Sequence, residues 1–270
     1  MDDTQIFFSH AKVNLGLKIL NKRSDGYHDI HSLFVELNLS DELMFLPNDS
    51  YDLSVEGQSS NQFPLDENNL ITKAYKLMHS ESTSISTEHS IHVKKNIPIG
   101  SGLGGGSSNA ATTLKALNKL WKLNFSLKKL ETIGIKLGAD VPFFIDGGIQ
   151  HVTGIGEVLK PVNFEAIQGL HFLLIVPDIH VSTVWAYKAL NISLQGDESV
   201  PNFSPLTKPV NWQLFENDFE RVIRSTYPEI DEIKSQLYAS GAVFAGLSGS
   251  GSTVFGIFNA PELAQESSAQ

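Results

Sequence analysis

A glycine- and serine-rich segment at residues 98–108, PIGSGLGGGSS, is the stretch whose residue types most directly indicate chemistry. Glycine lacks a Cβ and adopts positive φ, so successive N–H groups can turn toward one point and bind an anion. The Ala- and Leu-rich run that follows predicts a helix, whose N-terminal dipole adds to the same site. Serine hydroxyls supply further donors, or a ligand to Mg²⁺. The segment therefore predicts a phosphate-binding loop, with a flexible linker as the alternative.

Two well-known phosphate-binding motifs do not fit this segment. A Walker A sequence requires Lys after its last glycine, but Ser107 follows Gly106. Gly100, Gly102 and Gly105 satisfy G-x-G-x-x-G, yet the acidic residue that a dinucleotide fold needs about 20 positions later is absent, because position 125 is Phe. A P-loop NTPase and a dinucleotide-binding fold are both disfavoured.

The composition sets further limits on function. The chain has 270 residues, of which 41% are hydrophobic, enough for one large domain or two smaller ones. A formal net charge of -10 argues against nucleic-acid binding, which requires clustered Lys and Arg. Cysteine is absent, which excludes disulfides and thiolate zinc sites. No stretch approaches the roughly 20 apolar residues that span a bilayer. We expect a cytoplasmic protein that binds neither nucleic acid nor membrane.

Residue periodicity predicts mixed strands and helices around the loop. Short strands are expected at 6–8, 13–19, 33–39, 43–46 and 91–93, with a helix near 70–78 that Asn68 or Asn69 caps. The helix after the loop could be capped by Ser107, Ser108 or Asn109. The remaining elements are expected in this order: a helix from Ser126 to about Gly138, a strand and turn at 147–162, a buried strand at 172–177, a short helix within 178–191, a surface loop at 193–209, a helix at 229–240 and two strands within 242–258.

Four segments together resemble a known enzyme family. The run PIGSGLGGGSSNAA resembles the central phosphate-binding motif of the GHMP kinases. AKVNLGLKILNKRSDGYHDIHSLF (11–34), LGADVPFF (137–144) and LSGSG (247–251) resemble, in order and spacing, the signature of the 4-diphosphocytidyl-2-C-methyl-D-erythritol kinase family. The DGYH element separates this family from its relatives. The resemblance covers nearly the whole chain and implies a two-domain α+β GHMP kinase fold, with domains at 1–160 and 161–270 and the active site in the cleft between them.

The resemblance also implies a reaction. It is the ATP-dependent phosphorylation of the 2-hydroxyl of 4-diphosphocytidyl-2-C-methyl-D-erythritol, with Mg²⁺, in the methylerythritol phosphate pathway to isoprenoid precursors. Asp140 matches the general base and Lys12 the cation that pairs with it. The proline at position 142 predicts an extended chain that holds the carboxylate in a fixed direction. Without the resemblance, Asp140 would be interpreted as a turn residue and Lys12 as a solvated lysine.

Further residues match the substrate-binding positions of the family. Tyr27 and Tyr187 are expected to stack on the cytosine and His28 to hydrogen-bond its edge, with Thr183 nearby and Asn14 facing the cleft. Helix packing is the alternative role for Tyr187, and a plain hairpin turn is the alternative for LSGSG. His28 and His31 are spaced i, i+3, but no third ligand is evident and no protein-held metal is predicted.

The nucleotide is expected to contact the loop and two residues that flank the adenine in relatives. These two are Asn69 and Lys95. The loop residues are Pro98, Ile99, Gly100, Ser101, Gly102, Leu103, Gly104, Gly105, Gly106, Ser107 and Ser108.

The sequence departs from the family pattern at three places. His10 stands where relatives have Pro, Ser250 stands where they often have Thr, and relatives generally continue beyond position 270 through another helix and strand. The C-terminal sheet edge is therefore expected to be incomplete or shortened.

Two other functions stay open: a GHMP kinase for another small alcohol, which would not need Tyr27 and Tyr187, and a silent nucleotide-binding module. We expect a monomer or a weak homodimer.

Overall fold

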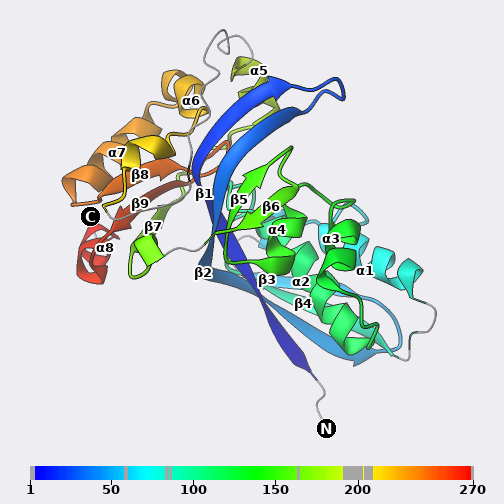
Figure 1. Ribbon diagram of the computed structural model, residues 1–270. Coiled ribbons are helices and arrows are strands. Elements are labelled where there is room, and N and C mark those ends of the chain that lie inside the picture. The colour runs from blue at the N-terminus through cyan, green and yellow to red at the C-terminus, as the bar shows by residue number, and fades with distance from the viewer. Residues whose placement is uncertain are drawn as a thin grey trace. The chain divides into compact units, whose positions relative to one another are not determined.

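The computed structural model describes residues 4–57, 60–82, 85, 87–162, 165–190, 203 and 209–268 (Figure 1). The chain forms two compact units. The first contains Met1–Lys12, Glu36–Ile99 and Gly104–Gly148, and the second contains Val13–Val35, Gly100–Leu103 and Ile149–Gln270. Because two long strands contribute to both units, neither unit is continuous in sequence. A single boundary at residue 160 stays a prediction.

The two longest strands are β1 (Gln5–Lys22) and β2 (His28–Asn48). The prediction of two short strands in place of each was wrong. The polar residues between the predicted halves, Ser9 and Lys12 in β1 and Asp41 in β2, are buried and bonded in the interior rather than exposed in a turn. Polarity at these positions therefore does not interrupt the strands.

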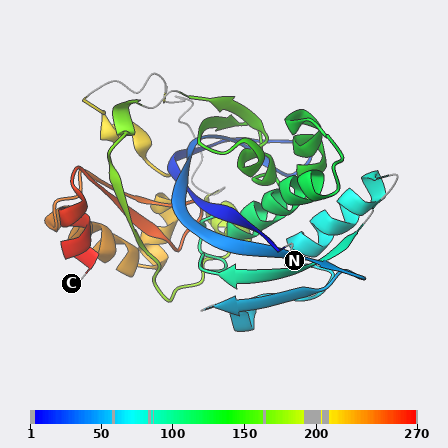
Figure 2. The same cartoon turned by 90° about the horizontal axis from the view of Figure 1, so that it is seen from below.

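The first unit packs helices against a sheet. The end of β2 pairs antiparallel with β4 (Glu88–Lys95), and β4 pairs parallel with β3 (Leu53–Gly57). Helices α1 (Leu70–Glu81) and α2 (Gly105–Leu120) lie on one face of these strands (Figure 2), followed by α3 (Leu127–Gly134) and α4 (Val141–Asp146). A short 3₁₀ helix, η1 (Ser60–Gln62), precedes α1. Fully buried apolar side chains between these layers include Leu43, Phe45, Ile71, Leu114 and Phe143.

The predicted helix caps of the first unit are partly confirmed. Asn69 caps α1 by accepting from the N–H of Ile71, and Ser126 caps α3 by accepting from the N–H of Lys129. The predicted caps of α2 were wrong, because the helix begins earlier, with Gly104 at its N-cap. Gly104 has φ +72, and a Cβ there would meet the Phe144 ring at 2.8 Å, so this cap must be glycine.

The LGADVPFF segment is not extended, contrary to the prediction. It forms a turn and then α4, with Asp140 at the N-cap. Pro142 lies in the first turn of that helix, where its missing N–H costs no hydrogen bond. The carboxylate of Asp140 is therefore carried by the start of a short helix.

The second unit contains the other ends of β1 and β2 and a separate sheet. Residues 32–35 of β2 pair with β5 (Ile149–Thr153), which pairs with β6 (Val158–Pro161), as predicted for this region. The separate sheet has the order β7-β9-β8 (His171–Ile175, Val254–Phe258 and Phe244–Leu247) and is antiparallel. This confirms the predicted strands, although β7 is half-buried rather than buried.

Helices complete the second unit. They are α5 (Thr183–Leu190), α6 (Glu220–Thr226), α7 (Glu229–Ala239) and α8 (Pro261–Ser268), with 3₁₀ turns η2 (Glu165–Ile167) and η3 (Trp212–Phe215). The helices predicted around α5 and α7 are confirmed, whereas α6 and α8 were not predicted. Leu237 of α7 is buried and lies over Gly256 of β9, where a Cβ would meet Leu237 Cδ2 at 2.8 Å. Most of the predicted loop at 193–209 lies outside the described residues.

Within the described part of the chain, no helix is both long and apolar enough to cross a membrane.

Candidate active site

The predicted phosphate loop lies between the end of β4 and the first turn of α2. Helix α2 is 16 residues long, and its first N–H groups, those of Gly105, Gly106 and Ser107, have no carbonyl partner in a preceding turn. Such groups and the helix dipole form an anion site at a helix N-terminus. The structure thus places the glycine-rich segment where the sequence predicted it, directly before a long helix.

Lys12 and Asp140 form the ion pair that the resemblance implied. Lys12 Nζ lies 3.5 Å from Asp140 Oδ2, and the lysine side chain is 5% exposed whereas the aspartate side chain is 33% exposed. The cation is therefore buried behind a carboxylate that a bound molecule can reach. A Cβ on Gly104 would lie 3.2 Å from Lys12 Cε, so the last residue of the loop lies against this pair.

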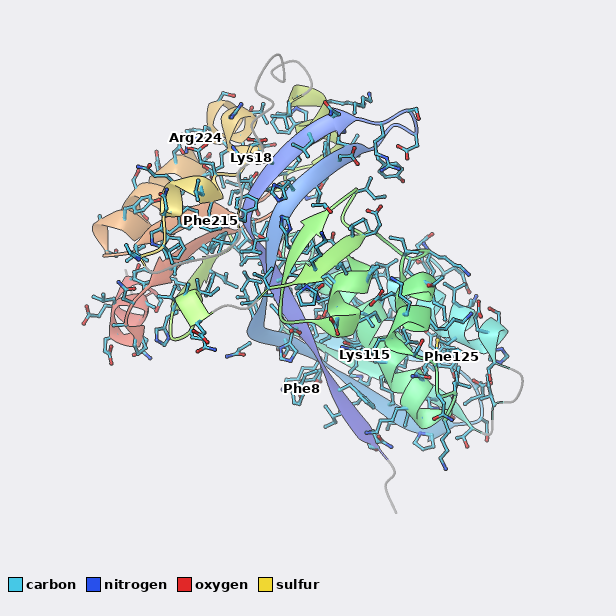
Figure 3. All side chains as sticks on the ribbon, viewed as in Figure 1. Phe8, Lys18, Lys115, Phe125, Phe215 and Arg224 are labelled. Carbon is cyan, nitrogen blue, oxygen red and sulfur yellow. The ribbon has the colours of Figure 1, made fainter. Side chains whose placement is uncertain are left out.

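The turn and short helix that carry Asp140 lie against α2 at Ser107 and Lys115. Ser107 Oγ lies 3.9 Å from the position that a Cβ on Gly138 would take, and the turn is closed by the N–H of Val141, which donates to the carbonyl of Gly138. Lys115 of α2 donates from Nζ to the carbonyl of Phe144 in α4 at 2.8 Å (labelled in Figure 3). Burial lowers the pKa of Lys115, and no local pattern in the sequence indicates that this lysine joins α2 to α4.

The two residues predicted near the adenine have structural partners of their own. Asn69 is buried, and its amide caps α1 and donates to the carbonyl of Pro64. Lys95 Nζ lies 2.6 Å from Asp41 Oδ2, and burial lowers the pKa of this lysine while the Asp41 charge opposes that shift. Asp41 is not among the residues predicted for the site, although an acidic residue amid alternating apolar residues is a signal of a buried carboxylate. A cavity of about 380 Å³ in the same unit is lined by Glu56, Gly57, Lys94, Lys95 and Asn96.

In the second unit, two of the predicted cytosine contacts touch each other. The rings of His28 and Tyr187 are stacked, with centroids 5.0 Å apart and planes at 20°. Tyr187 also meets Phe219 edge-on at 4.9 Å. Tyr27, in the turn between β1 and β2, is 60% exposed. Thr183 is exposed at the start of α5, with its hydroxyl 2.8 Å from that of Ser250.

The LSGSG segment forms the hairpin turn between β8 and β9, as one of its two predicted roles required. It also supports the loop, because Ser248 Oγ donates to the carbonyl of Gly102 at 3.0 Å and a Cβ on Gly102 would lie 2.4 Å from the carbonyl oxygen of Ser248. Asn14 lies next to this turn, since its N–H donates to Ser248 Oγ at 3.4 Å. The amide of Asn14 donates to Ser32 Oγ at 3.2 Å.

His31 does not pair with His28 but with a histidine of β5. The Nε2 atoms of His31 and His151 contact each other, and both side chains are shielded from solvent. Burial, with the neighbouring His151, lowers the pKa of His31 to about 4. No group of three or more His, Cys, Asp or Glu that could hold a metal is found among the described residues.

A larger cavity of about 700 Å³ lies in the second unit, among residues of η3, α6, α7 and β8 (Phe215 and Arg224 are labelled in Figure 3). Each of its three cationic lining residues pairs with a carboxylate. Arg224 and Lys234 both bond Glu220, and Arg221 lies 3.5 Å from Asp218. The cavity therefore offers no surplus positive charge to a phosphate.

Comparison with known proteins places this geometry in a family. The family model described as "GHMP kinases N terminal domain" matches residues 69–148, and the model described as "GHMP kinases C terminal" matches residues 208–269. The 4-diphosphocytidyl-2-C-methyl-D-erythritol kinase of Chlorobium limicola is 40% identical over 266 residues, which cover 96% of this chain and 90% of that protein. The same-named kinase of Thermodesulfovibrio yellowstonii is 42% identical over 262 residues, covering 92% of this chain and 88% of the relative.

Solved structures agree with these relatives. A crystal structure of 4-(cytidine 5'-diphospho)-2C-methyl-D-erythritol kinase superposes with a TM-score of 0.81 at 32% identity, covering 98% of this chain and 94% of that one. Homoserine kinase from Cytophaga hutchinsonii shares the fold, with a TM-score of 0.71 at 22% identity over 98% of this chain and 88% of its own. The chain therefore belongs to the 4-diphosphocytidyl-2-C-methyl-D-erythritol kinase family of GHMP kinases, and its fold is the two-domain α+β fold of that superfamily.

Proposed function

We propose that the protein transfers the γ-phosphoryl group of ATP to the 2-hydroxyl of 4-diphosphocytidyl-2-C-methyl-D-erythritol, in the methylerythritol phosphate pathway. The observation that carries this proposal is the contact between the Lys12–Asp140 pair and Gly104, the last residue before α2. It joins a base, a buried cation and an anion-binding helix N-terminus in one unit. The names of the relatives supply the identity of the alcohol.

Asp140 acts as the general base in this proposal. Phosphoryl transfer passes through a loose transition state, so the enzyme mainly positions the reactants, stabilises charge and accepts the hydroxyl proton. The carboxylate is the accessible partner of the pair, and the buried ammonium of Lys12 holds it in place and stabilises the negative charge that develops on the substrate oxygen. Asp140 therefore takes the proton as the oxygen attacks.

The N-terminus of α2 binds the nucleotide phosphates in this proposal. The N–H groups of Gly105, Gly106 and Ser107 donate to phosphate oxygens. Mg²⁺ takes oxygen ligands, and the Ser107 hydroxyl in the first turn of α2 would be one of them, which leaves the Asp140 carboxylate available as the base. When bound, the ion neutralises phosphate charge. The hydroxyl of Ser108 is less suited, because it is buried and accepts from Ser9.

Base recognition is assigned to aromatic and main-chain groups. Tyr27 and the stacked pair of His28 and Tyr187 are the proposed cytosine contacts, because aromatic faces stack on bases and the imidazole can bond a base edge. The cavity beside Lys95 is the proposed adenine site. Because the Lys95 ammonium is bonded to Asp41, Lys95 would contact adenine through its main chain.

The test is ADP release by the purified protein with ATP and Mg²⁺. The compound 4-diphosphocytidyl-2-C-methyl-D-erythritol, mevalonate and homoserine are offered in parallel, and Asp140→Asn is the control. We expect turnover only with the cytidine compound, reduced roughly 10²- to 10⁴-fold in the variant. Turnover with another alcohol would keep the kinase and remove the cytosine site. Nucleotide binding without any turnover would favour the silent binding module.

A further inference from the structure

We propose that Asp41 is a positioning residue of the phosphate loop, and that its carboxylate fixes the residues on both sides of that loop. The proposal rests on the proposed function for the role of the loop, but it adds a residue outside the sequence motifs. Asp41 lies in β2, between the two apolar runs of that strand, and its side chain is fully buried.

Among the residues that the structure describes, every hydrogen bond to the Asp41 carboxylate comes from a group near the loop. Oδ1 accepts from the N–H groups of Asn96 and Ile97, both at 2.8 Å. Oδ2 accepts from Lys95 Nζ at 2.6 Å and from Asn109 Nδ2 at 2.8 Å. Asn96 and Ile97 lie between the end of β4 and the loop, and Asn109 lies in α2, just after the loop. One carboxylate therefore binds the chain before and after the loop.

Residues before the loop and at the start of α2 contact the Lys95 ammonium, which pairs with Asp41. Lys95 Nζ also donates to the carbonyl of Ile97 at 2.6 Å. A Cβ on Gly105, the first residue of α2, would lie 3.1 Å from Lys95 Nζ and 3.0 Å from Ile97 Cγ2. The absence of a side chain at position 105 thus lets the helix start approach the buried lysine. Moving Lys95 would move both Ile97 and the contact surface of Gly105.

The same network reaches the strand that carries the catalytic lysine. Asn109 Nδ2 donates to Ser9 Oγ at 2.9 Å, and Ser9 Oγ donates to Ser108 Oγ at 2.8 Å. Ser9 and Lys12 belong to β1. All of these side chains are buried. The network therefore links the start of α2, where the phosphates are proposed to bind, to the strand that supplies Lys12.

Energetics favour positioning over stability as the role of this network. A buried ion pair contributes little net stability compared with apolar residues of similar volume, because desolvation offsets the attraction. Small errors in the position of reacting groups, by contrast, cost large factors in rate. A fully buried carboxylate with four donors, all next to one loop, is an arrangement that fixes the loop's geometry.

The experiment compares Asp41→Asn and Asp41→Ala with the wild type. The Asn variant keeps one oxygen that accepts from the two main-chain N–H groups, but its NH₂ group faces the Lys95 ammonium and the Asn109 amide. The Ala variant removes all four hydrogen bonds. We expect the Kd for MgADP to rise about 10-fold in the Asn variant and more in the Ala variant. Amide hydrogen exchange at Asn96 and Ile97 should accelerate in the same order, while the KM for the alcohol substrate stays within about 2-fold.

Tyr75→Phe is the matched control for loss of stability. Tyr75 is buried in the same unit, and its hydroxyl bonds Glu88 and the N–H of His89. Those residues begin β4, whose length of 8 residues at about 3.3 Å each puts them roughly 23 Å along the strand from Lys95. This variant should lower Tm without changing the MgADP Kd or the exchange at Asn96 and Ile97.

The outcomes separate the proposal from its alternatives. Equal MgADP affinity in wild type and Asp41→Asn, or the same weakening in Tyr75→Phe, would overturn it. If Asp41→Ala does not fold, the Asn variant and its exchange data decide. The MgADP affinity and the amide exchange do not use the acceptor alcohol, so a wrong substrate would appear in the ADP-release assay and would leave this inference standing.

Discussion

Replacing Lys12 by methionine tests whether the Lys12–Asp140 pair acts as one catalytic unit. At 3.5 Å, a pair of unit charges interacts by about 1.2 kcal/mol at a dielectric constant of about 80 and by about 4.7 kcal/mol at about 20. Because the lysine is buried and the aspartate one-third exposed, the value lies between these limits, at about 2–3 kcal/mol. If the charge acts in the transition state, Lys12→Met lowers kcat by roughly 30- to 150-fold.

A double-mutant cycle measures the coupling directly. The variants are Lys12→Met, Asp140→Asn and the double substitution, and kcat and both KM values are measured for each. Residues that act together are not additive, so the double variant should be about as slow as Asp140→Asn alone. Lys18→Met is the matched control, because Lys18 (labelled in Figure 3) lies on the same strand and pairs with Asp218 at 3.1 Å. We expect its kcat to stay within about 3-fold of the wild type.

Additivity would refute this reasoning. If the two single effects multiply in the double variant, Lys12 and Asp140 act independently, whatever their distance. A kcat for Lys12→Met within about 3-fold of the wild type would remove the buried charge from the chemical step. A fall of similar size in Lys18→Met would trace the effect to β1 rather than to the pair.

Three further predictions address the substrate site, the histidine pair and the helix that carries the base. Tyr27→Ala should raise the KM for the cytidine substrate about 5- to 150-fold, since base stacking on an aromatic ring contributes about 1–3 kcal/mol, and should leave the KM for ATP nearly unchanged. Equal effects on both would exclude stacking. The pKa of His31 is lowered to about 4, so the unfolded chain binds more protons than the folded chain between that pH and about 6.5. The free energy of unfolding should therefore fall by up to about 3 kcal/mol as the pH drops through this range. Thermal melts should show a smaller fall in His31→Gln, and an unchanged pH slope in that variant would contradict the assignment. Lys115→Met removes the donor to the Phe144 carbonyl and should lower stability by about 1 kcal/mol and reduce kcat more than it changes the KM for ATP; a change in that KM alone would contradict a role in holding α4.

The sequence predicted the strand and helix types better than their lengths. Alternation identified the apolar halves of β1 and β2, but the polar residues between them, such as Ser9 and Asp41, suggested breaks. Their partners lie far along the chain, since Ser9 bonds Ser108 and Asp41 bonds Lys95. Local periodicity carries no information about such long-range partners, so burial of these groups could not be inferred from it.

The same limit explains the errors near the site. The Gly104 cap of α2 is set by the Phe144 ring, which lies in another element. Asp140 was expected in extended chain because a proline follows at position 142, yet a proline also suits the first turn of a helix. Both local rules were valid, and only the packing of α4 against α2 selects between them. The Lys12–Asp140 contact itself was implied by family resemblance and not by spacing.

The acidic net charge does not conflict with the binding of two polyanions, and the partners of the buried lysines explain how. Lys12 is paired with Asp140, Lys95 with Asp41, and Lys115 with the carbonyl of Phe144. Carboxylates neutralise two of these lysines, and each of the three is bonded to a residue that positions part of the proposed site.

A phosphate-binding lysine of the Walker type is also absent from the loop sequence. In the proposed site, the phosphate charge would be met mainly by oriented main-chain N–H groups at α2 and by Mg²⁺, and the contribution of the N–H groups depends on backbone geometry rather than on net charge. Affinity for nucleotide should accordingly respond more to Asp41, which fixes that geometry, than to substitution of exposed lysines.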